Sequence, residues 1–390
     1  MLVDHSLIYT DATGDQTGAL LIRDGRVVAT GKAAVALRDQ GERIVRPEGA
    51  CIVPALSDAH CHLWGVGLRA NACDVSHADT PSDIYSALRD YDVDDSPTGW
   101  VLGYGWDDHR WPDDRLPDRK TLDEAFPETP LCLHRVDRHA IIVNGEALRR
   151  AGFEAEADEL SSGRVIRDGE GEAVILVDDA MQPVLDVIPG ADDQEDRQLF
   201  ESSAERYLSH GVTWTHMALL EVERIPMLRE MDDDGQLPLR VYGIIDGNDG
   251  ALDDVLEGGP RPDEDCWLSL SAIKLFADGA LGSRGAHLLE PYEDGSNGVI
   301  MQSKEELVER VQRYTDAGFQ VATHAIGDAA ARAVLDAYAT VPDALRRQLR
   351  LRLEHAQMLA PGDCRRLAEL GVVASIQPIH LRSDAVWAAK

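Results

Sequence analysis

Lysine is scarce in this chain of 390 residues, because only five of its 38 basic residues are lysine. These cations face 70 aspartates and glutamates, which leaves a formal net charge of -32. Such a charge repels phosphate backbones, so nucleic acid is excluded as an expected partner. We interpret acidic runs such as 232–234 as a hydrated surface adapted to high salt, where self-repulsion is screened. The alternative is an acidic protein of an ordinary cytoplasm, which folding in dilute buffer would favour.

Cysteine is also sparse, and long apolar runs are missing. The six cysteines are scattered without a CxxC pair, which argues against a disulfide scaffold and for a reducing compartment. No apolar run approaches the roughly 20 residues needed to cross a bilayer. The first residues, MLVDHSLIYTDATGD, have neither a basic region nor an apolar core, so we expect no signal peptide. The expectation is a cytoplasmic protein that does not bind membranes, with its oligomeric state undetermined.

The composition is otherwise that of a globular chain, with 44% hydrophobic and 28% charged residues. Its length fits an α/β barrel of about 200–250 residues with additions. Residues 1–52 alternate short apolar runs with turn signals, which predicts a small β portion at the N-terminus. We place the boundary near residue 50, where an apolar strand, Cys51–Val53, precedes Pro54.

The rest of the chain, residues 53–390, is expected to form the barrel. Buried strands are expected at 212–215, 240–245, 268–276, 319–323, 349–353 and 372–376. Helices are expected at 202–210, 328–338 and 361–370, and Ser303 with Glu306 forms a capping box that opens another. Repeated βα units imply a parallel sheet with right-handed crossovers. The weakly periodic segment at about 70–200 is interpreted as an inserted α+β domain.

Two histidines mark a strand end in the segment Asp58–Ala59–His60–Cys61–His62. In an extended chain, residues two apart point to the same side, so His60 and His62 can bind one metal ion while Cys61 faces away. Two ordinary polar histidines would give the same pattern. The position at a strand end favours the metal.

Three more candidates lie at or just past the C-terminal ends of expected strands, namely Lys274, His324 and His355. In a (β/α)8 barrel these ends converge on the mouth that holds the active site. We therefore predict one metal site shared by all five residues. Lys274 is costly to bury as a cation, and a neutral lysine can add CO2 to become a carbamate able to bridge two metals. A lysine paired with Asp278 at the rim is the alternative.

Six longer segments resemble the amidohydrolase superfamily, and within it the YtcJ-like metal-dependent hydrolases of amidohydrolase family 3. The resemblance covers nearly the whole chain. The segments are DAHCHL from Asp58, WVLGYGWD from Trp100, RVDRH from Arg135, KLFADGALGSR from Lys274, THAIGD from Thr323 and LEHAQ from Leu353.

This resemblance implies a barrel with a small β-sandwich built from both chain ends, and a metal-activated water that attacks an amide or similar bond. His60 and His62 would hold the first metal, His324 and His355 the second, and Lys274 would bridge them as a carbamate. One or two divalent ions are implied. Zinc is the first expectation, although iron or manganese would fit the same nitrogen and oxygen ligands.

The chain departs from the family pattern in two places. Pro54 is followed by Ala55 where the family has Pro-Gly, which should alter the turn and leave the ligands untouched. The family also typically continues beyond Lys390, through an Asp that binds metal and acts as the general base. We therefore expect a barrel that is incomplete at the C-terminus, with no catalytic base assigned. Asp384 is not given that role, because family members carry the catalytic Asp later.

Arg135, His139 and His380 are the residues expected to contact the substrate. Arg135 and His139 fall in the inserted region that would cover the mouth, where a structural ion-pair cluster is the alternative. For His380 the alternative is an ordinary loop histidine.

The predicted function is a metal-dependent hydrolase of non-peptide carbon–nitrogen bonds in a small molecule. A truncated, catalytically silent metal-binding fragment is one alternative, and its exposed strand edges would make it prone to aggregate. A deaminase or an esterase is another, because a fold does not fix a substrate. The inserted region does not identify the substrate.

Overall fold

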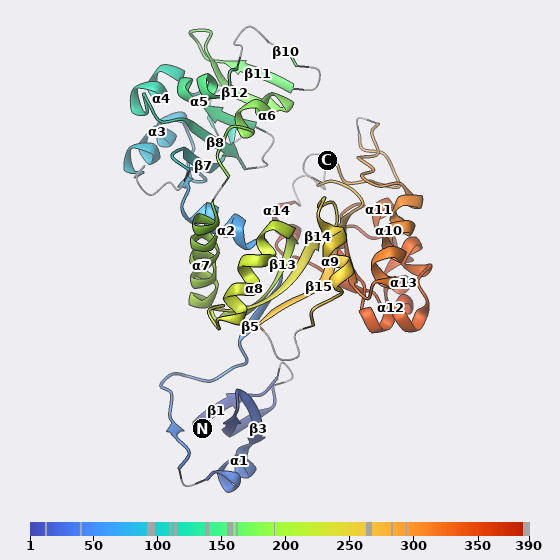
Figure 1. Ribbon diagram of the computed structural model, residues 1–390. Helices are drawn as coiled ribbons and strands as arrows, with labels where there is room; N and C mark the ends of the chain where they lie inside the picture. Colours follow the sequence, from blue (N-terminus) through green and yellow to red (C-terminus); the bar gives the residue numbers. More distant parts are fainter. Residues whose placement is uncertain are drawn as a thin grey trace. The chain divides into compact units, whose positions relative to one another are not determined.

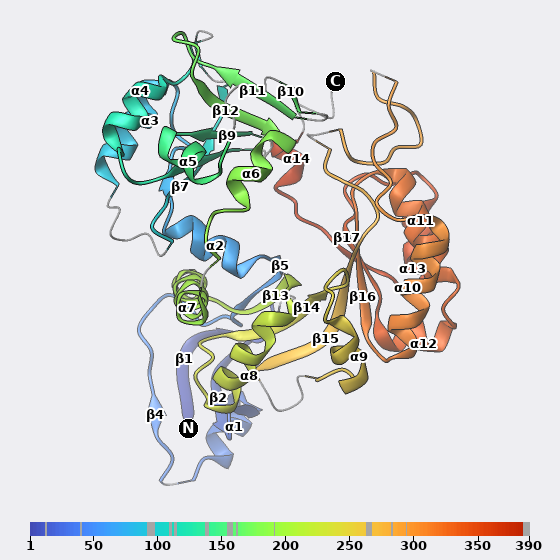
Figure 2. The same cartoon turned by 45° about the horizontal axis from the view of Figure 1, so that its top comes forward.

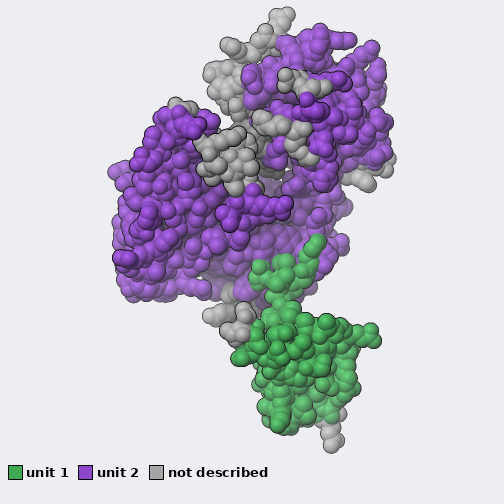
Figure 3. Space-filling model, turned by 180° about the vertical axis from the view of Figure 1, so that it is seen from behind, with its two compact units in different colours: residues 1–57, 210–213 green, residues 58–209, 214–390 purple. Residues whose placement is uncertain are grey.

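The computed structural model describes the chain except for residues 12–13, 40, 92–97, 109–110, 113–114, 137–139, 154–158, 161–162, 191, 263–266, 282–283, 294 and 385–390. The chain forms two compact units, which are coloured separately in Figure 3. Unit 1 comprises Met1–Ser57 with His210–Thr213, and unit 2 comprises Asp58–Ser209 with Trp214–Lys390. Within the described residues, no helix has both the length and the apolar character that a membrane span requires.

Unit 1 is built on a four-stranded sheet of order β3-β2-β1-β4. Its strands are β1 (Leu2–Tyr9), β2 (Gln16–Arg23), β3 (Arg26–Thr30) and β4 (Ile44–Val45), and helix α1 (Gly31–Leu37) contacts β2 and β3. Asp24 and Gly25 both have positive φ, at 49° and 73°. This is the type I′ geometry that matches the twist of a two-residue hairpin. Leu2, Ile8 and Leu21 of this sheet are buried.

Unit 2 contains a seven-stranded parallel sheet of order β18-β17-β16-β15-β14-β13-β5, nearly closed and consistent with a TIM-like barrel (Figure 1). Its strands are β5 (Leu56–Cys61), β13 (Val212–Leu220), β14 (Arg240–Asp246), β15 (Leu268–Phe276), β16 (Gln320–Ala325), β17 (Arg352–His355) and β18 (Val373–Ser375). The first residues of β5 and β13 belong to unit 1. β15 and β16 are buried along most of their length, as parallel strands covered on both faces should be.

Helices cover the outer side of this sheet, as Figure 2 shows for α10, α11 and α13. They are α8 (Ile225–Asp233), α9 (Leu252–Gly258), α10 (Lys304–Asp316), α11 (Asp328–Ala339), α12 (Asp343–Leu349) and α13 (Asp363–Leu370). The short helix α14 (His380–Ser383) follows β18 and is not one of them. The predicted capping box of α10 is confirmed, because the Ser303 side chain accepts from the Glu306 N–H and Glu306 accepts from Ser303. The side chains between helices and sheet form the main hydrophobic core.

A second sheet is inserted between β5 and β13, with strand order β10-β11-β12-β9-β8-β7-β6. Helices α2 (Leu63–Ala70) and α7 (Asp193–Ser209) connect it to the barrel. Its strands are β6 (Cys73–Asp74), β7 (Val101–Trp106), β8 (Leu131–Arg135), β9 (Ala140–Val143), β10 (Glu159–Leu160), β11 (Gly163–Arg167) and β12 (Ala173–Asp178), and its helices are α3 (Pro81–Asp90), α4 (Arg119–Ala125), α5 (Gly145–Arg150) and α6 (Gln182–Leu185).

Two glycines allow close approaches in this inserted part. A Cβ at Gly67 would lie 2.3 Å from the Leu199 carbonyl oxygen, so only glycine lets α2 pack this closely on α7. Gly105 has a φ of +102°, and a Cβ there would meet Ser76 at 2.7 Å. These contacts fix how β7 and α2 are placed around the cavity described below.

The strand before the histidine pair differs from the sequence expectation. Residue 52 makes only an isolated bridge to Ile8, and the barrel strand is β5, which starts at Leu56. Pro54 has no N–H to donate to a ladder, which explains why pairing resumes after it. Consequently His60 lies on the strand, whereas His62 follows it as the N-cap residue of α2.

Two other boundaries also move. Helix α7 starts at Asp193 and not near residue 202, because its acidic first turn suits the positive end of a helix dipole. The strand expected at 349–353 is displaced, since Leu349 ends α12 and Arg350 caps it with a left-handed φ of 56°. Strand β17 therefore begins at Arg352.

Candidate metal centre at the barrel mouth

Three histidine rings meet at the C-terminal ends of β5, β16 and β17. The ring centroids of His60 and His355 are 4.7 Å apart, and those of His324 and His355 are 4.5 Å apart. His62 is more exposed, and its ring lies 5.5 Å from that of His60. The parallel register explains the meeting, because Phe276 pairs with His324 and Ala325 with His355 across neighbouring strands.

His355 reaches this cluster through an unusual backbone. Alternation along β17 places Arg352 and Glu354 on one side of the sheet and Leu353 on the other. His355 should therefore share the side of Leu353, yet its ring lies beside His60, which Glu354 also contacts. His355 and Ala356 have positive φ values of 69° and 42°. This left-handed turn accompanies the redirection of His355 into the barrel, at a cost of about 1–3 kcal/mol per strained residue.

A buried ion pair lies beside the rings. Glu354 is 0% exposed and Arg352 is 5% exposed. The Arg352 guanidinium donates to Glu354 through Nε at 2.6 Å and Nη2 at 3.2 Å. It also donates to the Ala59 carbonyl at 2.7 Å and to Nδ1 of His216 at 2.7 Å. One guanidinium thus joins β17, β5 and β13 inside the barrel.

Glu354 fixes the orientation of His60. Burial alone would raise the pKa of Glu354, but the hydrogen bond with His60 and the Arg352 charge outweigh it and hold the pKa well below its usual range. An ionised carboxylate only accepts hydrogen bonds, so Nδ1 of His60 is the donor across the 2.5 Å contact. Similarly, Nδ1 of His355 lies 2.8 Å from Oε1 of Gln377 and donates to it. Both rings therefore keep Nε2 for another ligand.

Burial also keeps the histidines neutral. Desolvation, reinforced by the Lys274 charge, lowers the pKa of His324 to about 4. Desolvation and the neighbouring His324 lower the pKa of His355 to about 2. A neutral imidazole binds a metal through whichever ring nitrogen carries no proton.

Lys274 lies in the same buried region, with 1% of its surface exposed. Its Nζ forms no hydrogen bond or ion pair among the described residues and lies 5.2 Å from the centroid of the Phe276 ring. Burial lowers the pKa of Lys274 to about 8. The alternative of a rim pair with Asp278 is not what the structure shows. Asp278 is itself buried and accepts backbone N–H groups from His287, Ile326 and Gly327.

The donor chemistry of this cluster fits a divalent metal, since it combines neutral imidazoles with a lysine that readily loses its proton. Among the described residues, however, no three His, Cys, Asp or Glu side chains are arranged as a ready-made metal site. A metal role for these residues therefore belongs to the proposed function.

The expected substrate contacts are placed differently. Arg135 lines a cavity in the inserted part, and its Nη1 lies 3.6 Å from Oδ1 of Asp108. His380 stacks on His355 with centroids 5.9 Å apart, so it does reach the cluster. His139 lies outside the described residues. Asp384, which was not given a role, accepts a hydrogen bond from Gln357 at 2.6 Å.

Sequence reasoning missed Arg352, Glu354 and Gln377. The signal for the first two was present, because two charges of opposite sign alternate with leucines in the otherwise apolar segment from 351 to 354. Side chains two apart on a buried strand share a face, so such a pair predicts an internal ion pair. Gln377 had no comparable signal.

Comparisons with known proteins agree with this geometry. The model of the amidohydrolase family matches residues 47–390. The chain is 30% identical to "Putative amidohydrolase YtcJ" of Bacillus subtilis, a match that spans 96% of this chain and 72% of that protein. It is 27% identical to the N-substituted formamide deformylase of Arthrobacter pascens, over 95% of this chain and 71% of that protein.

A solved structure also matches. The crystal structure of an uncharacterized metal-dependent hydrolase from Pyrococcus furiosus has a TM-score of 0.79 at 26% identity, covering 98% of this chain and 78% of that one. The family match and the YtcJ relative both extend over most of the chain and include every residue of the histidine cluster. The chain therefore belongs to the amidohydrolase family, and it is a hydrolase of carbon–nitrogen bonds.

Proposed function

We propose that the chain is a metal-dependent hydrolase that cleaves a non-peptide carbon–nitrogen bond in a small molecule. The observation that carries the proposal is the cluster around His355, whose ring centroid lies 4.7 Å from that of His60 and 4.5 Å from that of His324. The metal-dependent hydrolase from Pyrococcus furiosus supports the same reading. A small organic substrate, and not nucleic acid, suits a chain of net charge -32.

His60, His62, Lys274, His324 and His355 are the residues that would hold one or two divalent ions, with zinc as the first choice. A divalent metal bound there would lower the pKa of a water molecule and polarise the carbonyl of the substrate. Glu354 and Gln377 hold the rings of His60 and His355 in the tautomers that present Nε2. His380, stacked on His355, lies where it can contact a bound substrate.

Lys274 is proposed to act as a carbamate. Its pKa of about 8 leaves a useful neutral fraction near pH 7.5. The cation first loses one proton to give the neutral amine. The amine nitrogen then forms a bond to the carbon of CO2, one C–O π bond becomes the carboxylate, and the nitrogen releases a second proton to solvent, so that a buried cation becomes an anion. That anion would lie beside neutral imidazoles, where it would supply oxygen ligands.

The substrate class is an amide or formamide. The N-substituted formamide deformylase of Arthrobacter pascens is related over most of this chain, which supports an N-substituted formamide as the first compound to test. We further propose that the protein works in the cytoplasm at high salt, an environment that its acidic surface suits.

The test uses the 390-residue chain in concentrated salt, loaded with zinc and freed of excess metal. Elemental analysis gives metal per chain for the wild type, for His60→Asn and for the control His5→Asn, whose histidine lies in unit 1. N-benzylformamide, benzyl formate and adenosine then report amide, ester and amino-group hydrolysis.

The proposal expects one or two metals per chain and formamide hydrolysis in the wild type and the control, and loss of both in His60→Asn. Preference for the ester or for adenosine would move the assignment to an esterase or a deaminase. A folded chain that binds metal and hydrolyses none of the three would support the catalytically silent alternative.

A further inference from the structure

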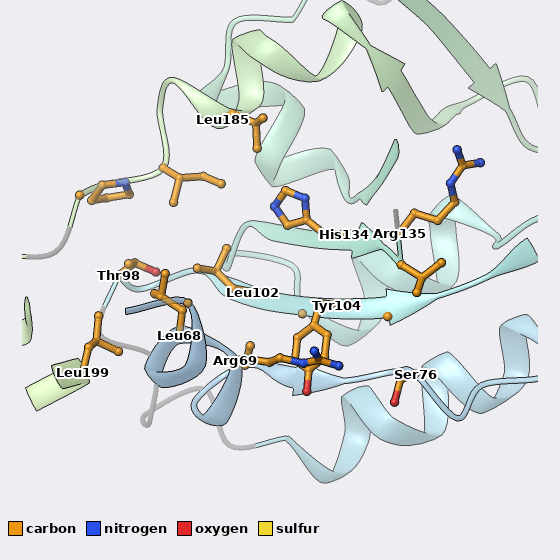
Figure 4. A pocket seen from close by; sticks show the side chains of 18 of the residues that line it. Leu68, Arg69, Ser76, Thr98, Leu102, Tyr104, His134, Arg135, Leu185 and Leu199 are labelled. Atoms are coloured by element: carbon orange, nitrogen blue, oxygen red, sulfur yellow. The ribbon is translucent and has the colours of Figure 1, made fainter. Parts of the chain in front are cut away.

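A cavity of about 480 Å³ lies between helix α2, helix α7 and the inserted sheet. Cavities of this size hold small organic ligands. One wall is apolar and comprises Leu68, Leu102, Leu185, Ile188 and Leu199. Figure 4 shows Leu68, Leu102, Leu185 and Leu199 of this wall together with Arg69, Tyr104 and His134, which come from α2, β7 and β8. Tyr104 and His134 are direct partners in the register of β7 and β8, so they share one face of the sheet.

Arg69 is the distinctive group of this cavity. Its guanidinium lies 4.1 Å from the centroid of the Tyr104 ring. Stacking occupies the face of the guanidinium and leaves the N–H groups at its edge for an acceptor. Among the described residues, no carboxylate forms an ion pair with Arg69. An edge of parallel N–H donors is the arrangement that binds a carboxylate in two-point fashion.

The other charged groups of the cavity are already paired. Arg224 stacks on Trp64 and forms ion pairs with Asp196 at 2.9 Å and Glu221 at 2.5 Å. Arg135 lies 3.6 Å from Asp108. Arg69 is therefore the cation left to meet a ligand, in a chain whose net charge otherwise disfavours anions.

Helix α2 links the cavity to the candidate metal centre. His62 is the residue immediately before α2, and Gly65, three residues later, lines the cavity. A Cβ at Gly65 would lie 3.7 Å from Cβ of His62. The cavity wall at Gly65 therefore lies within one helical turn of His62, although none of the five candidate metal ligands is among the residues that line the cavity.

We propose that this cavity binds the substrate through a carboxylate on Arg69 and an apolar group against the leucines, with the scissile bond toward His62. The inference rests on the proposed function, because it assigns the substrate class of that same site. The substrate is accordingly an amide that carries both an apolar group and a carboxylate.

The test compares two formamides that differ only in the carboxylate, N-formylphenylalanine and N-formyl-2-phenylethylamine. Binding of each is measured by calorimetry on metal-free protein, and hydrolysis is measured on zinc-loaded protein, at one fixed salt concentration. The variants are Arg69→Gln, Leu68→Trp and the control Arg240→Gln. Arg240 is a matched control because it is also exposed and lies over an aromatic ring, that of Trp267, at 5.1 Å. Leu68 is 40% exposed, so a larger side chain there fills the cavity with little disturbance of the core.

The wild type and Arg240→Gln should bind the acid about tenfold more tightly than its neutral partner, as expected for a charged hydrogen bond. Arg69→Gln should remove this preference and raise KM for the acid with kcat little changed. Leu68→Trp should weaken both compounds. Equal binding of the two compounds by the wild type, or equal behaviour of Arg69→Gln and Arg240→Gln, overturns the inference.

The experiment distinguishes failure of the proposed function from failure of the cavity assignment. Hydrolysis of both formamides without a preference for the acid leaves the proposed function intact and refutes the cavity assignment. Tight, Arg69-dependent binding of the acid to metal-free protein without hydrolysis supports the cavity and contradicts the proposed function.

Discussion

Replacing Glu354 by Gln should strongly destabilise the metal-free protein. The substitution keeps the side-chain shape and removes the charge, while Arg352 remains 5% exposed with only neutral partners, His216, the Ala59 carbonyl and Ser375. The NH2 group of the introduced amide would face either the Arg352 guanidinium or the His60 ring, and both of these are donors to Glu354 in the wild type. Removing one partner of a buried ion pair costs about 3–5 kcal/mol, and we expect that loss in the free energy of unfolding.

The assay is urea unfolding of chelator-treated protein, with the midpoint and slope of the transition measured together. The double variant with Arg352→Met also removes the stranded cation, so its loss should fall short of the sum of the two single losses by about 2 kcal/mol or more. The control is Asp253→Asn, which breaks an ion pair with Arg313 whose side chains are 74% and 51% exposed. It should change stability little, because exposed pairs contribute little. A loss in Glu354→Gln as small as in this control, or additive losses in the double variant, would refute the internal ion pair.

Three further predictions concern stability. Burial lowers the folded pKa values of His216, His324 and His355 from 6.5 to about 4, 4 and 2. Below pH 6.5 the unfolded chain therefore binds protons that the folded chain does not, and the metal-free protein should lose up to about 1.4 kcal/mol of stability per pH unit per histidine as pH falls from about 6.5 to 4. Urea unfolding at a series of pH values measures this loss, and a stability that does not change with pH would contradict neutral histidines. Ala356 has a φ of 42°, so Ala356→Val should lower stability by about 1–2 kcal/mol more than Ala356→Gly, and equal losses would contradict a left-handed backbone. Asp278 accepts three backbone N–H groups at 2.8 to 3.0 Å, so Asp278→Asn should cost about 2–3 kcal/mol by thermal or urea unfolding, whereas no loss would show that these contacts are dispensable.

The barrel elements were predictable where apolar periodicity and local signals agreed. Strand 268–276 was predicted with its observed bounds, because this segment is mostly apolar from Leu268 to Phe276. The capping box at Ser303 likewise marked the start of α10. The predicted strand boundaries were wrong where a residue with a special backbone interrupted an apolar run. Pro54 moved the pairing of the first barrel strand to Leu56, and the left-handed cap at Arg350 shortened β17.

The site was predictable to the extent that parallel strands bring their C-terminal ends together. That rule places His60, His324 and His355 in one cluster, as the ring distances confirm. It does not give the backbone turn at His355, because a positive φ in a non-glycine residue leaves no mark in the sequence. Nor does it give the cavity around Arg69, which depends on the packing of α2 against α7, a helix far away in sequence.

The metal dependence of amide hydrolysis tests the central claim most directly. N-benzylformamide hydrolysis should be followed in protein stripped by a chelator, in the same protein reloaded with zinc, and in reloaded His355→Asn. We predict that stripping abolishes the activity, that zinc restores it in the wild type, and that the variant stays inactive while remaining folded. Full activity in the stripped protein, or in the reloaded variant, would contradict a metal-dependent hydrolase built on this histidine cluster.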